Sequence, residues 1–186
     1  EIRLSLVGSE MCIRDSYNTP MPVFSACAGA ALYRKAYLEK TGLLDELHFA
    51  YLEDVDLGYR ARIAGYRNSY EPTAKVYHAG SASTGSRYNP FKITHSSRNS
   101  IYLIYKNMPF FQLLLNLPFL AAGFFIKTLF FCTKGYAGVY LKGLGKGFKL
   151  CLTPEARQRK VRFKPANFGH YITIQLELWI NIFRRR

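Results

Sequence analysis

Acidic residues are almost absent from the second half of this 186-residue sequence. Residues 91–186 hold 16 Lys and Arg against two Asp or Glu, whereas residues 1–90 hold 10 of each kind. This asymmetry indicates an anionic partner for the C-terminal half, either nucleic acid or a phospholipid surface. Cysteine is also scarce, and Cys12, Cys27, Cys132 and Cys151 show neither metal-ligand spacing nor the pattern of a small disulfide-rich domain. A reducing compartment fits this cysteine usage best.

A secretory signal peptide is not recognisable in residues 1–16, "EIRLSLVGSEMCIRDS". Glu1, Glu10 and Asp15 interrupt the segment, and it has no sustained apolar core. The segment resembles a translated sequencing-adapter artefact, although "IRLSLV" could also form a genuine strand. We therefore leave residues 1–16 out of the fold prediction and expect natural sequence to be missing upstream of residue 17.

The remaining chain is apolar enough to fold, because 49% of the residues are hydrophobic. The stretch "PVFSACAGAALYRKAYLEKTG" predicts a strand or turn followed by a helix of about a dozen residues that ends at Gly42. The small residues Ala26, Ala28, Gly29 and Ala30 in this stretch would let a backbone or a ligand approach closely.

Three carboxylates occur together in "HFAYLEDVDLGYRARIAGY", residues 48–66. The pattern predicts a helix from Glu53 to about Ala64, with Gly65 as its stop signal. Glu53, Asp54 and Asp56 would then lie in the first turn, where the helix dipole stabilises each acidic side chain by about 0.3–1 kcal/mol. This explanation requires no chemistry, and the spacing alone favours it over a catalytic role.

Shorter extended pieces surround the helical segments. "YRNSYEPTAKVYHAG" predicts two strands around Pro72, with His78 at the end of the second. A lone histidine is usually structural. The Ser, Thr and Gly residues of "GSASTGSRYNP" predict a mobile loop. The strict alternation of apolar residues in "ITIQLELWINI", residues 172–182, predicts another strand.

Four blocks, in order, resemble the C-terminal half of a family 2 glycosyltransferase of GT-A fold, rhamnosyltransferase-like in type. They are "ACAGAALYRKAYLEKTGLLDE", "FAYLEDVDLGYRARIAGYR", "EPTAKVYHAG" and "SSRNSIYLIYKNMP", which together span residues 23 to about 108. The resemblance implies an α/β class: a partial GT-A domain over residues 17–100 that lacks its nucleotide-binding half, followed by a membrane-associated, mainly helical region over residues 101–186.

The activity implied by the resemblance is inverting transfer of a sugar from a nucleotide-diphosphate donor to an acceptor hydroxyl. Asp54 would be the general base, because a carboxylate can take the proton of an attacking hydroxyl. Glu53 would orient the acceptor or support the site, and Asp56 would serve helix initiation or packing. His78 becomes a candidate ligand for Mg²⁺ or Mn²⁺ beside the diphosphate. Arg98 could reach the donor diphosphate, or equally cap a helix.

Two departures from the family pattern concern the donor side. The nucleotide-binding half, with its Asp-x-Asp metal motif, would precede residue 17. The spelling Asp54-Val55-Asp56 lies in the acceptor-side helix, so we do not interpret it as that motif. We therefore expect a fragment that is inactive alone.

A 20-residue uncharged run, "NMPFFQLLLNLPFLAAGFFI", lies between Lys106 and Lys127. Its length is about that required to span a bilayer. Pro109 and Pro118 are expected to interrupt a uniform helix, and a polar stripe favours a helix that lies in or dips into the membrane interface. The stripe consists of Gln112, Asn116, Gly123 and Lys127.

The segment "GVYLKGLGKGFKL" places Lys142, Lys146 and Lys149 on one helical face. Basic amphipathic segments bind anionic membrane surfaces. Apolar neighbours of these lysines are Tyr140, Leu141, Leu144 and Phe148. The run "GLGKG" lacks the spacing of a phosphate-binding loop, and no nucleic-acid fold motif accompanies "RQRKVRFKP".

Three hypotheses follow from the sequence. The first is a membrane-associated glycosyltransferase on the cytoplasmic face, acting on an envelope glycan or lipid-linked acceptor, since positive charge stays on that side. The second is a non-catalytic basic membrane-binding module. The third, a nucleic-acid-binding protein, is disfavoured by the adjoining apolar run.

Overall fold

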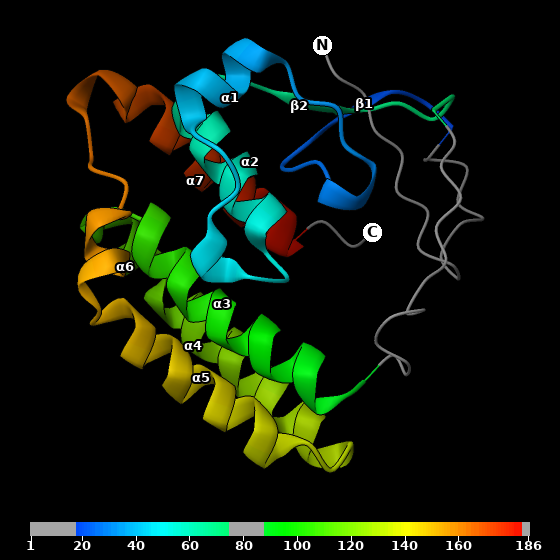
Figure 1. The fold of residues 1–186 in the computed structure, drawn as a ribbon, viewed down its shortest axis with the longest axis vertical. Helices are drawn as coiled ribbons and strands as arrows, with labels where there is room; N and C mark the ends of the chain where they lie inside the picture. Colours follow the sequence, from blue (N-terminus) through cyan, green and yellow to red (C-terminus); the bar gives the residue numbers. More distant parts are fainter. Residues whose placement is uncertain (1–17, 75–87, 184–186) are drawn as a thin grey trace. The chain divides into compact units, whose positions relative to one another are not determined.

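The computed structural model describes residues 18–74 and 88–183, coloured along the chain in Figure 1. The chain divides into two compact units. Within the described residues, the first unit comprises 18–46 and 53–74, and the second comprises 47–52 and 88–183. The predicted second strand after Pro72, the Ser/Thr/Gly loop up to residue 87 and the "IRLSLV" segment lie outside the described residues.

The first unit combines a small sheet with two helices. Strands β1 (Met21–Val23) and β2 (Asn68–Tyr70) pair antiparallel, with Met21 opposite Tyr70. Between them in sequence lie the short 3-10 turn η2 (Ala28–Ala30), helix α1 (Lys35–Thr41) and helix α2 (Glu53–Ile63). A second 3-10 turn, η3 (Glu46–His48), precedes α2. In Figure 1 the labels of α1, β2 and β1 lie near one another, with α1 and β1 in blue and β2 in green.

The core of the first unit consists of aromatic and small side chains. Tyr37 of α1 packs against Leu57 and Ala61 of α2. Gly58, also in α2, lies so close to the segment after β1 that an added Cβ would be 2.5 Å from the Cβ of Ser25. Helix α2 can therefore approach this segment only because residue 58 has no side chain.

Both predicted helix ends in the first unit are confirmed, but α1 is shorter than expected. Gly42 has φ +80°, and its N–H donates to the carbonyl of Leu38; Gly65 has φ +87°. Helix α1 has seven residues instead of about a dozen, because the preceding residues form η2 and an extended stretch.

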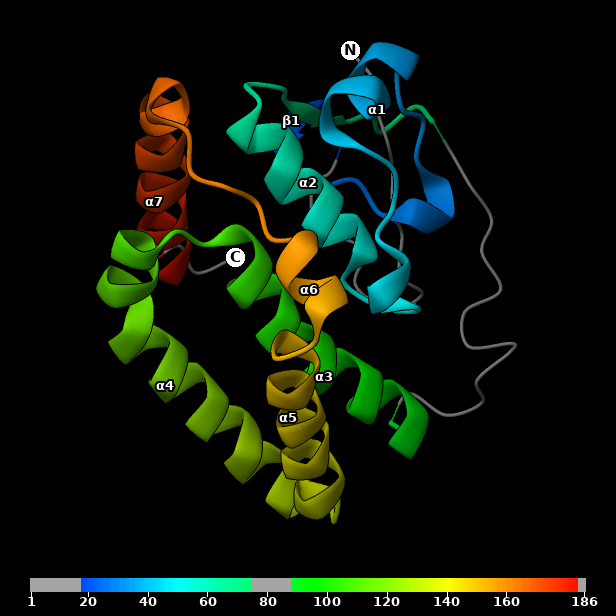
Figure 2. The same ribbon diagram turned by 60° about the vertical axis from the view of Figure 1, so that its left-hand side comes forward.

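The second unit is helical within the described residues. Helix α3 (Pro90–Asn107) begins at Asn89, whose Oδ1 accepts the N–H of Lys92 at 2.8 Å. It is followed by α4 (Phe110–Thr133), α5 (Ala137–Cys151), α6 (Pro154–Gln158), the 3-10 turn η4 (Pro165–Asn167) and α7 (Phe168–Phe183). Figures 1 and 2 show α3 and α5 lying alongside each other in both views.

Two glycines allow α5 to pack tightly on α3. A Cβ at Gly147 would lie 2.6 Å from the carbonyl oxygen of Arg98, and a Cβ at Gly143 would overlap the hydroxyl of Ser97. Gly143 and Gly147 are four residues apart, so both fall on the same face of α5. The glycine-rich run that lacked phosphate-loop spacing is therefore a helix-packing surface.

Helices α4 and α7 meet through a reciprocal pair of amides. The side-chain N–H of Asn116 donates to Gln175 at 2.7 Å, and Gln175 donates back to Asn116 at 3.0 Å. Both residues are buried. Around them, Phe111 of α4 contacts the rings of Phe168 and Tyr171.

Two predictions for this unit were wrong. Residues 172–182 form part of helix α7 rather than a strand. Tyr171, Ile174 and Gln175 are the residues it buries, and this spacing is helical. Pro118 does not interrupt α4, which continues through it; the missing N–H removes one backbone hydrogen bond without ending the helix.

The predicted fold class remains a prediction. The described sheet has two strands, and most described residues are helical. Such an arrangement neither confirms nor excludes a partial GT-A domain. The expected domain boundary at residue 100 lies inside α3, and it too remains a prediction.

Candidate functional site

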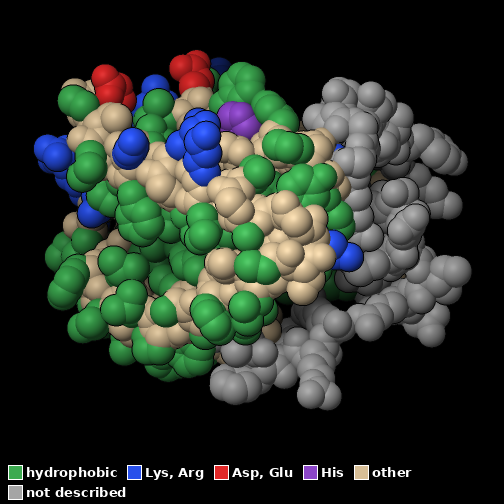
Figure 3. Space-filling model, turned by 90° about the horizontal axis from the view of Figure 1, so that it is seen from below, with side chains coloured by type: hydrophobic (Ala, Val, Ile, Leu, Met, Phe, Trp, Pro, Cys, Tyr) green, Lys and Arg blue, Asp and Glu red, His purple; other side chains and the backbone are tan. Residues whose placement is uncertain are grey.

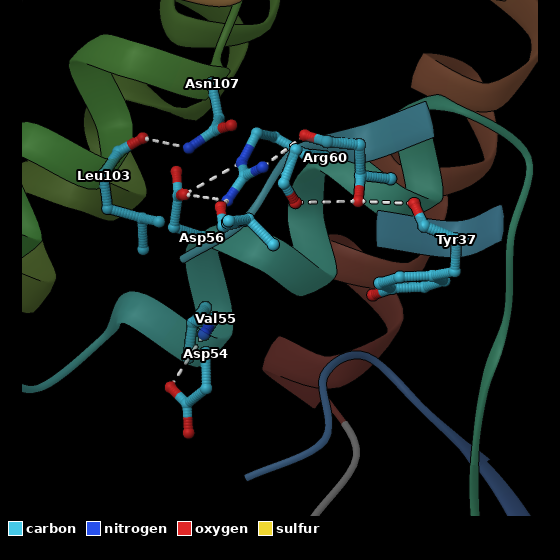
Figure 4. Close-up of polar contacts among 10 residues, drawn as sticks. Tyr37, Asp54, Val55, Asp56, Arg60, Leu103 and Asn107 are labelled. Atoms are coloured by element: carbon cyan, nitrogen blue, oxygen red, sulfur yellow. Dashed lines mark hydrogen bonds and ion pairs between the residues drawn. The ribbon is translucent and has the colours of Figure 1, made fainter. Parts of the chain in front are cut away.

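The acidic pair lies at the start of α2, where the sequence placed it. Asp54 is half-buried, and its Oδ2 is 3.4 Å from the backbone N–H of Ala28. Its Oδ1 accepts the N–H of Val55 at 2.7 Å, as shown in Figure 4. The small-residue stretch after β1 therefore lies against this carboxylate, and the absence of large side chains there lets the backbone donate to it.

Glu53 is also half-buried, and its environment favours the protonated form. Burial raises the pKa of the Glu53 carboxyl, and the negative charge of Asp54 raises it further. Oε2 of Glu53 has no hydrogen-bond partner among the described residues. The two neighbouring carboxyls therefore differ in their surroundings, since only Asp54 accepts a hydrogen bond from the stretch after β1.

Cys27 and Tyr33 belong to the same site, and the sequence did not single them out. Burial raises the pKa of the Cys27 thiol, as do the nearby charges of Asp54 and Glu53. The pKa of Tyr33 is raised by burial first, then by Tyr37 and Asp54. Both side chains therefore remain protonated at neutral pH, so Cys27 is a weak nucleophile. The only sequence signal was the small-residue stretch that contains Cys27.

Asp56 has a different role from Asp54. Figure 4 shows the two side chains projecting to opposite sides of α2. The carboxylate of Asp56 is buried and forms an ion pair with Arg60 at 2.8 Å. Arg60 also donates to the carbonyls of Thr41 and Leu43, which follow α1. Asp56 thus orients an arginine that ties α2 to the end of α1, in agreement with the packing role expected for it.

The metal prediction rested on His78, which lies outside the described residues. Among the described residues, a candidate metal-binding group consists of the buried side chains of Asp45, His48 and Asp56. The Oδ2 atom of Asp56 already binds the guanidinium of Arg60. A divalent cation at this group would share the carboxylate of Asp56 with the fixed positive charge of Arg60, which lowers the affinity of the group for Mg²⁺ or Mn²⁺. We assign no chemical step to a metal.

Arg98 contacts the backbone of the loop that precedes α2. Its guanidinium donates to the carbonyls of Leu47 and His48, and its Nε donates to Asn99 at 2.9 Å. The neighbouring Asn99 is fully buried and makes further bonds to the same loop. The predicted role of Arg98 in donor or acceptor binding remains a prediction.

The four lysines predicted to contact a membrane are exposed: Lys127 on α4, and Lys142, Lys146 and Lys149 on α5. Of the apolar residues expected beside the α5 lysines, Leu141 and Phe148 are exposed, whereas Tyr140 is buried and Leu144 is half-buried. Figure 3 shows a face on which hydrophobic side chains are widespread and basic side chains are few.

Helix α4 is the one described helix long and apolar enough to cross a membrane. Only 6% of its apolar stretch is buried. The core helix of a soluble protein would be mostly buried, so this helix does not fit that description.

Comparison with known proteins supports a glycosyltransferase-like relationship. The chain is 35% identical over 82 residues to N-acetylglucosaminyl-diphospho-decaprenol L-rhamnosyltransferases from two strains of Mycobacterium tuberculosis. The match covers 44% of this chain and 27% of each relative, so the chain spans about a quarter of the length of these curated relatives. No protein-family model matches the chain, and no solved structure matches it. A glycosyltransferase-type function is supported at the family level.

Proposed function

We propose that this chain carries the acceptor side of an inverting glycosyltransferase of family 2. The enzyme would move a sugar from a nucleotide-diphosphate donor to a hydroxyl of an envelope glycan or a lipid-linked acceptor. The observation that carries the proposal is the half-buried Asp54 at the start of α2, in a chain similar to a named rhamnosyltransferase.

Asp54 is the general base in this proposal. As the acceptor hydroxyl attacks the anomeric carbon, its proton passes to a carboxylate oxygen of Asp54, while the bond from that carbon to the donor phosphate breaks and the nucleotide diphosphate leaves. The N–H groups of Ala28 and Val55 bind the carboxylate and orient it. Glu53 supports the site, because its Oε2 is buried without a hydrogen-bond partner among the described residues and suits a carboxyl that hydrogen-bonds an acceptor hydroxyl.

The acceptor class follows from the name of the relatives, which specifies a diphospho-decaprenol lipid. An acceptor of this chemistry keeps its polyprenyl tail in a membrane. The exposed apolar α4 and the exposed lysines of α5 suit a protein that works at an anionic membrane surface. We place that surface on the cytoplasmic face, where positive charge is retained.

The test of the catalytic proposal is Asp54→Asn in the complete natural polypeptide that contains this sequence. Transfer from radiolabelled nucleotide-sugars to a polyprenyl-diphosphate-linked acceptor would be measured, and thermal unfolding would check the fold. We expect a loss of at least about a hundredfold in kcat with an unchanged midpoint. Glu39→Gln, an exposed carboxylate on α1, is the matched control and should retain activity. Full turnover by Asp54→Asn would refute the assignment.

The membrane proposal has its own test. Replacing Lys142, Lys146 and Lys149 with glutamine should weaken binding to vesicles containing phosphatidylglycerol by about a hundredfold, since each lysine contributes about 1 kcal/mol near anionic lipid. Binding to pure phosphatidylcholine should not change. Glutamine at Lys35 and Lys40, two exposed lysines of α1, is the control. An equal effect of the control would show that net charge, and not α5, determines binding.

The alternative, a non-catalytic basic membrane-binding module, is supported by the same exposed helix α4. The two proposals make different predictions in these assays. Vesicle binding together with no donor-dependent transfer by the complete polypeptide would favour the alternative.

A further inference from the structure

The loop that leads into the acidic pair has an unusual backbone. Phe49, Tyr51 and Leu52 have φ values of 60°, 70° and 67°. Residues with a Cβ avoid this left-handed region, and three of them within four positions persist only where surrounding contacts impose the conformation. Leu52 is followed directly by Glu53, so the strained backbone leads into the first turn of α2.

Asn99 of α3 supplies the contacts that impose this conformation. Its carboxamide nitrogen is 2.8 Å from the carbonyl oxygen of His48, and 2.7 Å from those of Ala50 and Tyr51. Its Oδ1 accepts the Nε–H of Arg98. The side chain is fully buried, so its loss would take the side-chain donor from the carbonyls of Ala50 and Tyr51, whereas the carbonyl of His48 would keep its bond from Arg98.

Arg98 extends the same set of contacts by one residue. Its guanidinium donates to the carbonyls of Leu47 and His48. Together, Arg98 and Asn99 donate to the carbonyls of four of the six residues between 47 and 52. We call these two side chains the loop clasp.

Side-chain packing attaches the loop to the same helix. The ring of His48 lies 4.9 Å from that of Tyr102, and the rings of Phe49 and Tyr51 both contact Phe91. Phe49 nonetheless remains 73% exposed. Packing alone would therefore not hold Phe49 in a left-handed conformation, and the hydrogen bonds of the loop clasp are required.

We propose that Asn99, assisted by Arg98, is a positioning residue for the acidic pair. It fixes the left-handed conformations of Phe49, Tyr51 and Leu52, and so the start of the helix that presents Glu53 and Asp54. This inference rests on the proposed function for its catalytic consequence. It gives Arg98 a role through the loop in place of direct binding of the donor diphosphate.

The test compares Asn99→Leu with Ser100→Ala. Ser100 is the next residue of α3, and its hydroxyl donates to the carbonyl of Ser96 in its own helix. In Asn99→Leu, hydrogen exchange of the amides of residues 49–54 should accelerate by about tenfold to a hundredfold, because the two N–H groups that the carboxamide shares among the carbonyls of His48, Ala50 and Tyr51 are lost. The pKa of Glu53, followed by carboxyl carbon NMR, should fall toward its ordinary value as the site hydrates. Ser100→Ala should change neither.

The enzymatic readout separates this proposal from the proposed function. If the complete polypeptide transfers sugar, Asn99→Leu should lower kcat by at least tenfold with little change in the KM for the donor. If it shows no transfer, the proposed function fails. Hydrogen exchange of the amides of residues 49–54, together with the pKa of Glu53, then still tests the positioning role. Two results would overturn the positioning role. One is hydrogen-exchange protection of the loop amides in Asn99→Leu equal to that in Ser100→Ala. The other is faster loop exchange in Asn99→Leu with unchanged kcat and an unchanged pKa of Glu53.

Two further variants keep the test decisive if Asn99→Leu folds poorly. Arg98→Lys retains the charge but loses the planar fork, so it should loosen the loop and lower kcat. A change confined to the donor KM would instead indicate diphosphate binding and overturn the loop role of Arg98. Adding Leu52→Gly to Asn99→Leu should restore part of the loop protection, because glycine enters the left-handed region without steric cost. Absence of any restoration would contradict the backbone mechanism.

Discussion

Replacement of Gly147 by alanine tests the close packing of α5 on α3. An added Cβ would lie 2.6 Å from the carbonyl oxygen of Arg98 and 2.8 Å from the Cβ of Ile101. Neither atom is the end of a flexible side chain, so the helices must separate to admit the methyl group. Gly145 is the matched control, because a Cβ there would meet nothing within 4 Å.

Both substitutions gain the helix propensity of alanine, but only Gly147→Ala also carries the cost of overpacking. Alanine is favoured over glycine inside a helix by about 0.8–1 kcal/mol, and this gain applies to both positions. Overpacking costs about 1–3 kcal/mol and applies only at Gly147. We therefore expect Gly145→Ala to stabilise the protein by about 1 kcal/mol and Gly147→Ala to destabilise it by up to about 2 kcal/mol. The difference between the variants measures the overpacking itself.

Urea denaturation followed by circular dichroism at the helical band would measure both values. The urea dependence of the unfolding free energy should be the same for both variants, so that midpoints report stability. Equal stabilisation by the two alanines would refute the close approach of α5 to α3. The glycine-rich run would then have no role in helix packing.

Three further predictions use the same kind of measurement. Asn116→Leu should destabilise the protein by about 1–3 kcal/mol, because it leaves the buried amide of Gln175 unpaired. Adding Gln175→Leu should recover much of this loss of stability. Additive losses in a double-mutant cycle would contradict the pairing. Burial raises the pKa of Glu53, so its proton is bound more tightly in the folded state and stability should rise as pH falls through that pKa toward the unfolded value. Glu53→Gln should therefore be more stable than wild type at pH 7, and a thermal-unfolding difference independent of pH would contradict this. Gly58→Ala should destabilise the first unit by about 1–3 kcal/mol, whereas Gly29→Ala, whose nearest neighbour would be 4.0 Å away, should have little effect on the unfolding midpoint.

The parts of the fold that were predicted well are those with local signals. Helix α2 was expected from Glu53 to about Ala64 and extends from Glu53 to Ile63, because acidic residues at its start and Gly65 after its end both act within a few residues. The strand before Pro72 was also expected and is β2. None of these features depends on what packs against the element.

Helix α7 shows why alternation misled the prediction. Apolar residues at every second position fit one face of a strand, but a sequence this rich in Ile and Leu also supplies an apolar stripe at helical spacing. In the structure the helix buries the amide of Gln175 against that of Asn116, which lies 59 residues earlier in the chain. A contact at that distance leaves no signal in a window of a dozen residues.

The candidate site was predicted in part for the same reason. The acidic pair and the small-residue stretch carry their own patterns, whereas the roles of Asn99 and Arg98 depend on carbonyls about 50 residues earlier in the chain. The small-residue stretch marks the neighbourhood of Cys27, but no sequence pattern marks the side chains of Cys27 and Tyr33 themselves. They become part of the site only because the segment after β1 lies against Asp54.

The surroundings of α4 bear on how this helix would contact a membrane if the membrane proposal is correct. The sequence favoured an interfacial helix because a stripe from Gln112 to Lys127 would face water. In the structure the first half of that stripe is buried, since Asn116 is paired with Gln175. The exposed side chains of α4 are mostly apolar, and they include Leu114, Leu115, Leu117, Phe125 and Ile126. At about 100 degrees per residue these positions cover roughly half the circumference of the helix. Because the amides of Gln112 and Asn116 are buried, little polar surface of α4 remains for water. If the chain binds a membrane as proposed, the pairing with α7 therefore favours deeper immersion of α4 in lipid than the sequence alone suggested.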